Sequence, residues 1–217
     1  MSIKNNLLEI KSSLPENVTL VAVSKTKPVA DLMEAYEAGQ RIFGENKIQE
    51  MADKFEQMPK DIEWHMIGHV QTNKVKFMAQ FVSLIHGVDS LKLLEEINKQ
   101  ALKNNRIIEC LLQIHIAKED TKFGLDEAEL NGLLQSETFA NLKNIKIKGL
   151  MGMATFTENQ DQIKKEFLHL KSIFDRISLL NSNISILSMG MSGDYQLAIE
   201  CGSTMIRIGS SIFGGRN

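Results

Sequence analysis

Two short turns rich in glycine and serine lie in the last third of the chain, at residues 189–194 (MGMSGD) and 207–211 (RIGSS). Each turn follows an apolar run typical of a strand, at a point where a helix can begin. The first N–H groups of a helix lack partners within it and lie at the positive end of its dipole, and glycine lets an anion approach closely. We therefore predict that both turns bind one phosphate group, through Ser192, Gly193, Gly209 and Ser210.

A lysine lies near the other end of the chain, where a strand should end. Residues 19–28 (TLVAVSKTKP) begin as a β-branched run typical of a buried strand, whose end carries lysine before a turn and Pro28, which favours a helix start. Strand alternation places Lys25 on one face with every second residue of the run, whereas Lys27 falls in the turn. A lone lysine at a strand end is usually a solvated surface residue. Beside a phosphate site, however, a neutral lysine amine can form a Schiff base with a phosphorylated aldehyde, which suggests pyridoxal phosphate.

Strand and helix patterns alternate along the whole chain. The expected strands are residues 18–23, 41–43, 64–67, 82–87, 108–114, 145–150, 184–187 and 205–208. The expected helices are an amphipathic segment at the amino terminus and residues 29–38, 47–55, 73–79, 90–103, 126–134, 160–180 and 195–201. This alternation requires parallel strands with right-handed crossovers, and eight repeats in 217 residues fit a small (β/α)8 barrel. We predict an α/β fold with a single TIM barrel domain over residues 1–217, with an open doubly wound sheet as the alternative.

Composition narrows the class of protein. The 43% of hydrophobic residues are enough for one core, and the net charge of -2, with lysines dispersed among glutamates, gives no basic patch for nucleic acid. No apolar run is long enough to span a bilayer, and the first residues lack the apolar core of a secretion signal. Cys110 and Cys201 are embedded in apolar sequence, as reduced core thiols are. We expect a cytoplasmic protein that binds neither nucleic acid nor membrane.

Six motifs occur in a fixed order: residues 22–28 (AVSKTKP), 43–46 (FGEN), 65–68 (HMIG), 149–151 (GLM), 188–192 (SMGMS) and 207–209 (RIG). Together they resemble the pyridoxal phosphate homeostasis protein family over nearly the whole chain. The resemblance implies a barrel of the fold-type III pyridoxal phosphate class, like the barrel domain of alanine racemases. It also implies a protein that carries or buffers pyridoxal phosphate in vitamin B6 homeostasis, with apo-enzymes as candidate recipients and little or no catalysis.

The resemblance assigns roles to individual residues near the cofactor ring. The lysine that follows the serine bears the cofactor as a Schiff base, which here is Lys25. Arg207 would face the pyridine nitrogen, and Asn46 and Met151 would line the pocket. Because arginine stays protonated and has no acceptor, it would leave that nitrogen unprotonated and make the cofactor a poor electron sink.

The phosphate-site residues also have ordinary structural explanations. The turn that contains Ser192 can simply cap the helix that follows it. Gly209 and Ser210 can form a plain strand-to-helix turn, although the resemblance assigns their amides to the phosphate, with serine where the family usually has threonine. We place Asp194 in the outer first turn of the helix, because a carboxylate facing the two turns would repel a phosphate.

Other candidate residues are weaker. Met151 is equally well explained as a core filler, and Asn46 as a turn residue. The loop at residues 67–74 has His69 and Val70 where the family usually has Pro-Leu. The five histidines lack a spacing typical of metal ligands, so we predict no metal site.

Two other functions compete with the carrier. An amino acid racemase is the first, since alanine racemases use this barrel, although such an enzyme also needs a second base from another chain and an additional β domain. A regulatory interaction module with a vestigial anion site is the second. We favour a carrier and expect it to be a monomer.

Overall fold

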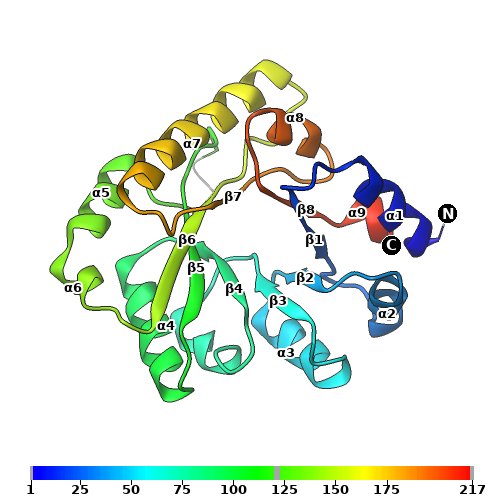
Figure 1. Ribbon diagram of the computed structural model, residues 1–217, viewed down its shortest axis with the longest axis horizontal. Coiled ribbons are helices and arrows are strands. Elements are labelled where there is room, and N and C mark those ends of the chain that lie inside the picture. The colour runs from blue at the N-terminus through cyan, green and yellow to red at the C-terminus, as the bar shows by residue number, and fades with distance from the viewer. Residues whose placement is uncertain (1, 120–122, 216–217) are drawn as a thin grey trace.

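The computed structural model describes residues 2–119 and 123–215, which form a closed barrel of eight parallel strands surrounded by helices (Figure 1). The strands are β1 (Thr19–Val23), β2 (Ile42–Glu45), β3 (Glu63–Met66), β4 (Leu84–Val88), β5 (Ile108–Gln113), β6 (Ile145–Met151), β7 (Ile186–Ser188) and β8 (Met205–Ile208). They neighbour one another in chain order, and β8 pairs with β1. The predicted TIM barrel is therefore confirmed, and the open doubly wound sheet is wrong because an open sheet has no such closing pair.

Helices follow the strands around the outside of the barrel, and most match the helical patterns in the sequence. They are α1 (Ile3–Ser13), α2 (Val29–Glu37), α3 (Ile48–Gln57), α4 (Leu91–Lys103), α5 (Glu127–Gln135), α6 (Glu137–Ala140), α7 (Gln160–Leu180), α8 (Tyr195–Glu200) and α9 (Ser210–Phe213). The helix α2 ends before Gly39 and α8 before Gly202, two glycines with positive φ angles of 91° and 95°. Such glycines end helices without steric cost.

The segment before β4 differs from the sequence prediction. Residues 73–79 were expected to be an α-helix, but the structure has the 3₁₀ helix η1 (Thr72–Phe77). Its hydrogen bonds span three residues, as from the Lys74 N–H to the Gln71 carbonyl at 3.0 Å. Val82, expected to begin the strand, donates instead to the Met78 carbonyl at 2.9 Å, so β4 starts two residues later. A 3₁₀ turn suits such a short connection.

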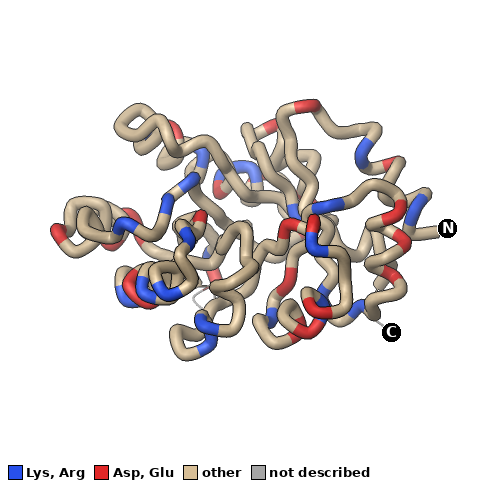
Figure 2. The backbone as a smooth tube through the Cα atoms, turned by 60° about the horizontal axis from the view of Figure 1, so that its bottom comes forward, with Lys and Arg blue, Asp and Glu red and all other residues tan. Residues whose placement is uncertain are grey.

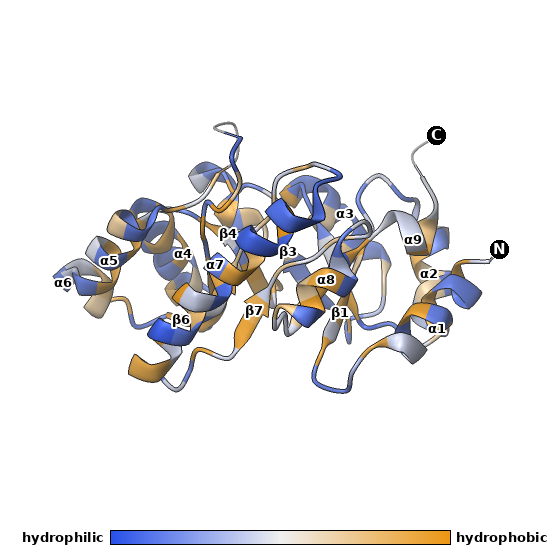
Figure 3. Cartoon of the chain, turned by 90° about the horizontal axis from the view of Figure 1, so that it is seen from above, coloured by the Kyte–Doolittle hydropathy of each residue, from blue (hydrophilic) through white to orange (hydrophobic). Residues whose placement is uncertain are grey.

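Apolar residues form two separate clusters, one on each side of the strands. The larger cluster lies between the barrel and the helices, and Figure 3 shows β7 hydrophobic along its length while helices alternate between polar and apolar colours. The smaller cluster joins residues from strands on opposite sides of the barrel, so it fills the barrel interior; its buried members are Val21, Leu84, Leu111, Met151 and Met205. The interior is thus packed, as in other TIM barrels.

Two histidines are also buried inside the barrel. His65 on β3 and His86 on β4 are 3% and 0% exposed, and their Nδ1 and Nε2 atoms lie 3.1 Å apart. Burial lowers the pKa of His65 from 6.5 to about 3. The pKa of His86 is also lowered, first by burial and then by His65 and Arg207. Both rings are therefore neutral near pH 7, so one ring donates and the other accepts.

Charged residues of both signs are interspersed along the chain (Figure 2). Within residues 2–119 and 123–215, no helix is both long enough and apolar enough to cross a membrane.

The neutral histidine pair predicts that acid destabilises the fold. Below pH 6.5 His65 becomes protonated in the unfolded chain, whereas in the folded protein it stays neutral down to about pH 3. The free energy of unfolding should therefore fall with pH by up to about 1.4 kcal/mol per pH unit from this residue. His65→Gln keeps an acceptor oxygen and does not titrate. The free energy of unfolding, measured with urea between about pH 6 and pH 4, should therefore fall less steeply with decreasing pH in this variant than in the parent protein. Equal slopes for the two proteins would contradict the buried neutral pair.

Candidate functional site

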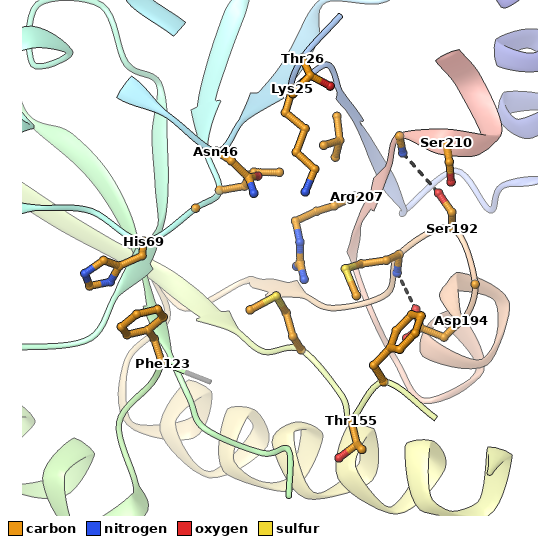
Figure 4. A pocket seen from close by; sticks show the side chains of 18 of the residues that line it. Lys25, Thr26, Asn46, His69, Phe123, Thr155, Ser192, Asp194, Arg207 and Ser210 are labelled. Atoms are coloured by element: carbon orange, nitrogen blue, oxygen red, sulfur yellow. Dashed lines mark hydrogen bonds between the residues drawn. The ribbon is translucent and has the colours of Figure 1, made fainter. Parts of the chain in front are cut away.

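A pocket of about 590 Å3 opens at the carboxyl ends of the strands, the face on which TIM barrels build their active sites. Its size is typical of sites for small molecules. Seven of the eight residues predicted from the sequence line this pocket: Lys25, Asn46, Ser192, Gly193, Arg207, Gly209 and Ser210. In Figure 4 the amine of Lys25 and the guanidinium of Arg207 lie at the centre, with Asn46 on one side and Ser192 and Ser210 on the other.

Lys25 reaches the pocket because the chain alternates beyond the end of β1. Val21 belongs to the interior cluster and Val23 lines the pocket, whereas Ser24 is buried and its hydroxyl donates to Glu45 at 2.6 Å. Lys25 is the next inward position and points into the pocket (Figure 4). Lys27 also lines the pocket, but its Nζ donates to the carbonyls of Phe213 and Gly215 at 2.9 and 3.0 Å. The contacts of the two amines therefore distinguish Lys25 from Lys27 as the candidate for binding a ligand.

The two glycine-rich turns meet at a single hydrogen bond. The N–H of Gly209 donates to Ser192 Oγ at 3.3 Å, which joins the turn after β7 to the turn after β8. The helices that begin at these turns, α8 and α9, have only six and four residues, so their dipoles are weak. An anion here would instead be bound by backbone N–H groups of the turns and by hydroxyl groups.

Asp194 is placed differently from the prediction. It is the N-cap residue of α8, and its carboxylate turns back to accept the Met191 N–H at 2.6 Å, so it lines the pocket instead of facing outward. The predicted cap by Ser192 is not formed, because the N-cap position is occupied by Asp194. The turn is thus stabilised by Asp194, which leaves Ser192 at the contact between the two turns (Figure 4).

Arg207 carries a buried positive charge into the pocket. It is 4% exposed, and its guanidinium donates to Ser188 Oγ at 2.6 Å and to the Gly152 carbonyl at 3.2 Å. Burial lowers its pKa to about 10, partly offset by the charge of Asp194, so it remains protonated near neutral pH. A buried cation that donates to a hydroxyl oxygen and a carbonyl oxygen, both neutral, is a strong donor for a polar ligand atom.

A buried hydrogen-bond chain continues from Arg207 into the barrel. Ser188 Oγ accepts from Arg207 and lies 3.0 Å from His86 Nδ1, and His86 in turn lies 3.1 Å from His65. A hydroxyl that accepts from arginine still has its own O–H to donate to a neutral imidazole. The chain therefore fixes the guanidinium from below. No spacing pattern along the chain predicts it, because its members come from the four strands β3, β4, β7 and β8.

Asn46 and Met151 have different outcomes. Asn46 lines the pocket, and its backbone packs so closely on Gly68 that a Cβ there would lie 2.4 Å from the Asn46 carbonyl oxygen. Met151 is fully buried in the interior cluster and is not among the residues that line this pocket. Met153, two residues later, does line it. The core explanation of Met151 therefore fits the structure, because the strand's last residue still faces into the packed barrel.

Aromatic residues border another side of the pocket. The rings of His69 and Phe123 are stacked with centroids 4.0 Å apart, and His69 Nδ1 lies 3.4 Å from Asp89 (Figure 4). The buried Gln113 donates to the Phe123 carbonyl at 3.0 Å. His69 thus makes a contact between two loops. Sequence reasoning missed it because the two residues are 54 positions apart.

The whole of residues 1–217 matches the family model described as alanine racemase, N-terminal domain. The pyridoxal phosphate homeostasis protein of Pasteurella multocida is 38% identical over 232 residues, and the match covers 100% of this chain and 99% of that protein. The alanine racemase of Bartonella henselae has the same fold with a TM-score of 0.73, at 19% identity, over 98% of this chain and 58% of that one.

PipY of Synechococcus elongatus is a more similar solved structure, at 34% identity over 98% of this chain and all of that one. The TM-score is 0.92 for PipY without pyridoxal phosphate and 0.89 for PipY with it bound. These matches cover nearly the whole chain. The chain belongs to the pyridoxal phosphate homeostasis protein family, built on the alanine racemase N-terminal domain.

Proposed function

We propose that this protein binds pyridoxal 5'-phosphate in the rim pocket and carries or buffers it in vitamin B6 homeostasis. The observation that supports this most directly is the convergence of an inward lysine, a buried arginine and two linked glycine-rich turns on one pocket of about 590 Å3. The solved PipY structure with pyridoxal phosphate bound has the same fold at 34% identity. When bound, the cofactor supplies an aldehyde that an amine can hold and a ring that can accept electrons.

Lys25 is the proposed attachment point, as a Schiff base. Its side chain points into the pocket, whereas Lys27 is bonded to two carbonyls at the end of α9. Arg207 lies opposite and has only donors, so it would donate to the pyridine nitrogen and keep that nitrogen unprotonated. Because an unprotonated ring is a poorer electron sink, Arg207 favours holding the cofactor over carbanion chemistry.

The phosphate would occupy the junction between the two turns. Ser192, Gly193, Gly209 and Ser210 line the pocket there, and the Ser192–Gly209 hydrogen bond marks where the turns meet. The carboxylate of Asp194 is bonded to the Met191 N–H, which limits its freedom to face the anion. We propose Asn46 as a further contact to the cofactor, and we expect Met153 at the position where Met151 had been predicted.

We further propose a monomeric, single-domain protein of the cytoplasm, with apo-enzymes as recipients of the cofactor. Both cysteines are free and buried, and burial raises the pKa of the Cys110 and Cys201 thiols. Unreactive thiols of this kind suit a reducing compartment.

An amino acid racemase is the alternative, because alanine racemase shares the barrel. The match covers 58% of the Bartonella henselae racemase, so the remaining part of that enzyme lies outside the similarity to this barrel. Long incubation with single-enantiomer alanine and chiral chromatography should show no turnover above that of Lys25→Ala. Rapid racemisation that depends on Lys25 would contradict the carrier function and favour the racemase.

Replacing Lys25 should abolish attachment of the cofactor. Lys25→Ala removes the amine, so the near-visible absorbance band formed with pyridoxal phosphate should disappear, and borohydride should leave no label on this peptide. Lys27→Ala is the matched control, and it should keep both signals because Lys27 binds carbonyls of the carboxyl-terminal segment. Persistent labelling of Lys25→Ala would refute the assignment. No labelling of the folded parent protein would favour the interaction module.

Replacing Ser192 should weaken binding of the phosphate but not of the ring. Loss of one hydroxyl hydrogen bond costs about 1 kcal/mol, so Ser192→Ala should bind pyridoxal phosphate roughly fivefold to tenfold more weakly. Binding of pyridoxal, which lacks the phosphate, should be unchanged in equilibrium titrations. Ser211→Ala is the control, because this exposed serine of the second turn is not among the residues that line the pocket. If Ser192→Ala weakened both ligands equally, the phosphate would not lie between these turns.

A further inference from the structure

An ion cluster of two buried residues, Lys54 and Glu45, and the partly exposed Glu50 lies outside the barrel wall, directly behind the turn that carries Lys25. Lys54 on α3 is 5% exposed, and its Nζ donates to the Ser24 carbonyl at 2.8 Å, to Glu45 Oε1 at 2.7 Å and to Glu50 Oε1 at 2.8 Å. An ammonium group has three N–H donors, so all of them are used. Lysine is rarely buried unless it is paired. Its burial here therefore points to a specific role for the cluster.

The cluster bonds to the residues on both sides of Lys25. On one side, Ser24 is held through its carbonyl by Lys54 and through its hydroxyl by Glu45 at 2.6 Å. On the other side, the N–H of Thr26 donates to Glu50 Oε1 at 2.6 Å. The chain immediately before and after Lys25 is thus fixed by side chains of β2 and α3.

The backbone of this turn needs such support. The Lys27 N–H donates to the Ser24 carbonyl at 3.1 Å, which closes a four-residue turn with Thr26 as its third residue. Thr26 has a φ of +63°, in the left-handed region that a β-branched residue rarely adopts. Turns with a positive φ at the third residue strongly favour glycine. Without outside bonds, the turn would relax, and the direction of Lys25 would change with it.

We propose that Lys54, Glu45 and Glu50 form a positioning clamp, which holds the strained turn at Ser24–Lys27 so that Lys25 points into the pocket. None of these three side chains is among the residues that line the pocket, so they act through the backbone of the turn. The proposal rests on the proposed function only in taking Lys25 as the cofactor's attachment point.

The test compares three variants of the intact protein. Glu50→Ala removes the acceptor for the Thr26 N–H, and Glu50→Gln keeps an acceptor oxygen at the same length of side chain. Glu56→Ala, an exposed glutamate on the same helix, is the matched control. Hydrogen exchange of the Thr26 amide is measured by NMR without cofactor, and borohydride labelling of Lys25 is measured against pyridoxal phosphate concentration.

Glu50→Ala should make Thr26 exchange about tenfold faster and should raise the pyridoxal phosphate concentration for half-labelling of Lys25 about tenfold. Glu50→Gln should lie near the parent protein in both measurements, and Glu56→Ala should match it. A second substitution separates positioning from general loss of stability. Thr26→Gly in the Glu50→Ala protein should restore most of the labelling, because glycine adopts a positive φ without steric cost.

The proposal is overturned if Glu50→Ala matches Glu56→Ala in both measurements, or if Thr26→Gly fails to restore labelling in a protein that far-UV circular dichroism shows to be folded. On the other side of Lys25, Ser24→Ala removes the hydroxyl bond to Glu45 and keeps the carbonyl bond to Lys54, so it should weaken labelling less than Glu50→Ala does; an unchanged value would count against the clamp. Thr26 exchange needs no cofactor, so it tests the clamp even if Lys25→Ala shows that the cofactor is attached elsewhere.

Discussion

The parallel pairing of β1 with β8 closes the barrel and brings the two ends of the chain together. Val21 is in register with Arg207, and Ala22 with Ile208. One step further along, a Cβ on Gly209 would lie 3.0 Å from the Val23 carbonyl oxygen, so the last turn packs on the strand that leads to Lys25. The proposed attachment lysine, the buried arginine and the second glycine-rich turn are therefore neighbours only because this pair of strands is hydrogen-bonded. A barrel that failed to close here would separate them.

Side chains alternate between the outer and inner sides of the barrel wall, so the residues that support the backbone lie outside and the residues of the pocket lie inside. Ser24 faces outward, where Lys54 and Glu45 hold it, and Lys25 faces inward to the pocket. On β8, Arg207 faces inward and is held from below by Ser188. Buried polar groups cost free energy unless they are hydrogen-bonded, so each of these contacts is also a constraint on geometry. The inner and outer contacts together hold the amine and the guanidinium in one pocket.

The sequence predicted the features that depend on local pattern. The eight strands and the inward direction of Lys25 follow from periodicity, and the two glycine-rich turns follow from residue type. Met151 was misplaced because a strand end can be located only to within a few residues, and one or two positions separate the packed interior from the pocket. Asp194 was misplaced because its bond to the Met191 N–H depends on the shape of the turn.

Contacts between elements that are far apart in the chain could not be predicted from the sequence. The chain of Arg207, Ser188 and the two histidines joins four strands, and the clamp on Ser24 and Thr26 comes from β2 and α3, some 20 to 30 residues away. Such contacts depend on barrel register and helix packing, which no single segment of sequence encodes.

A crystal structure of the protein soaked with pyridoxal phosphate would test the central claim most directly. We expect continuous electron density between Lys25 and the cofactor, with the phosphate between the turns at residues 192–193 and 209–210 and Arg207 against the ring nitrogen. Cofactor density bound to another lysine, or a phosphate away from both turns, would contradict it.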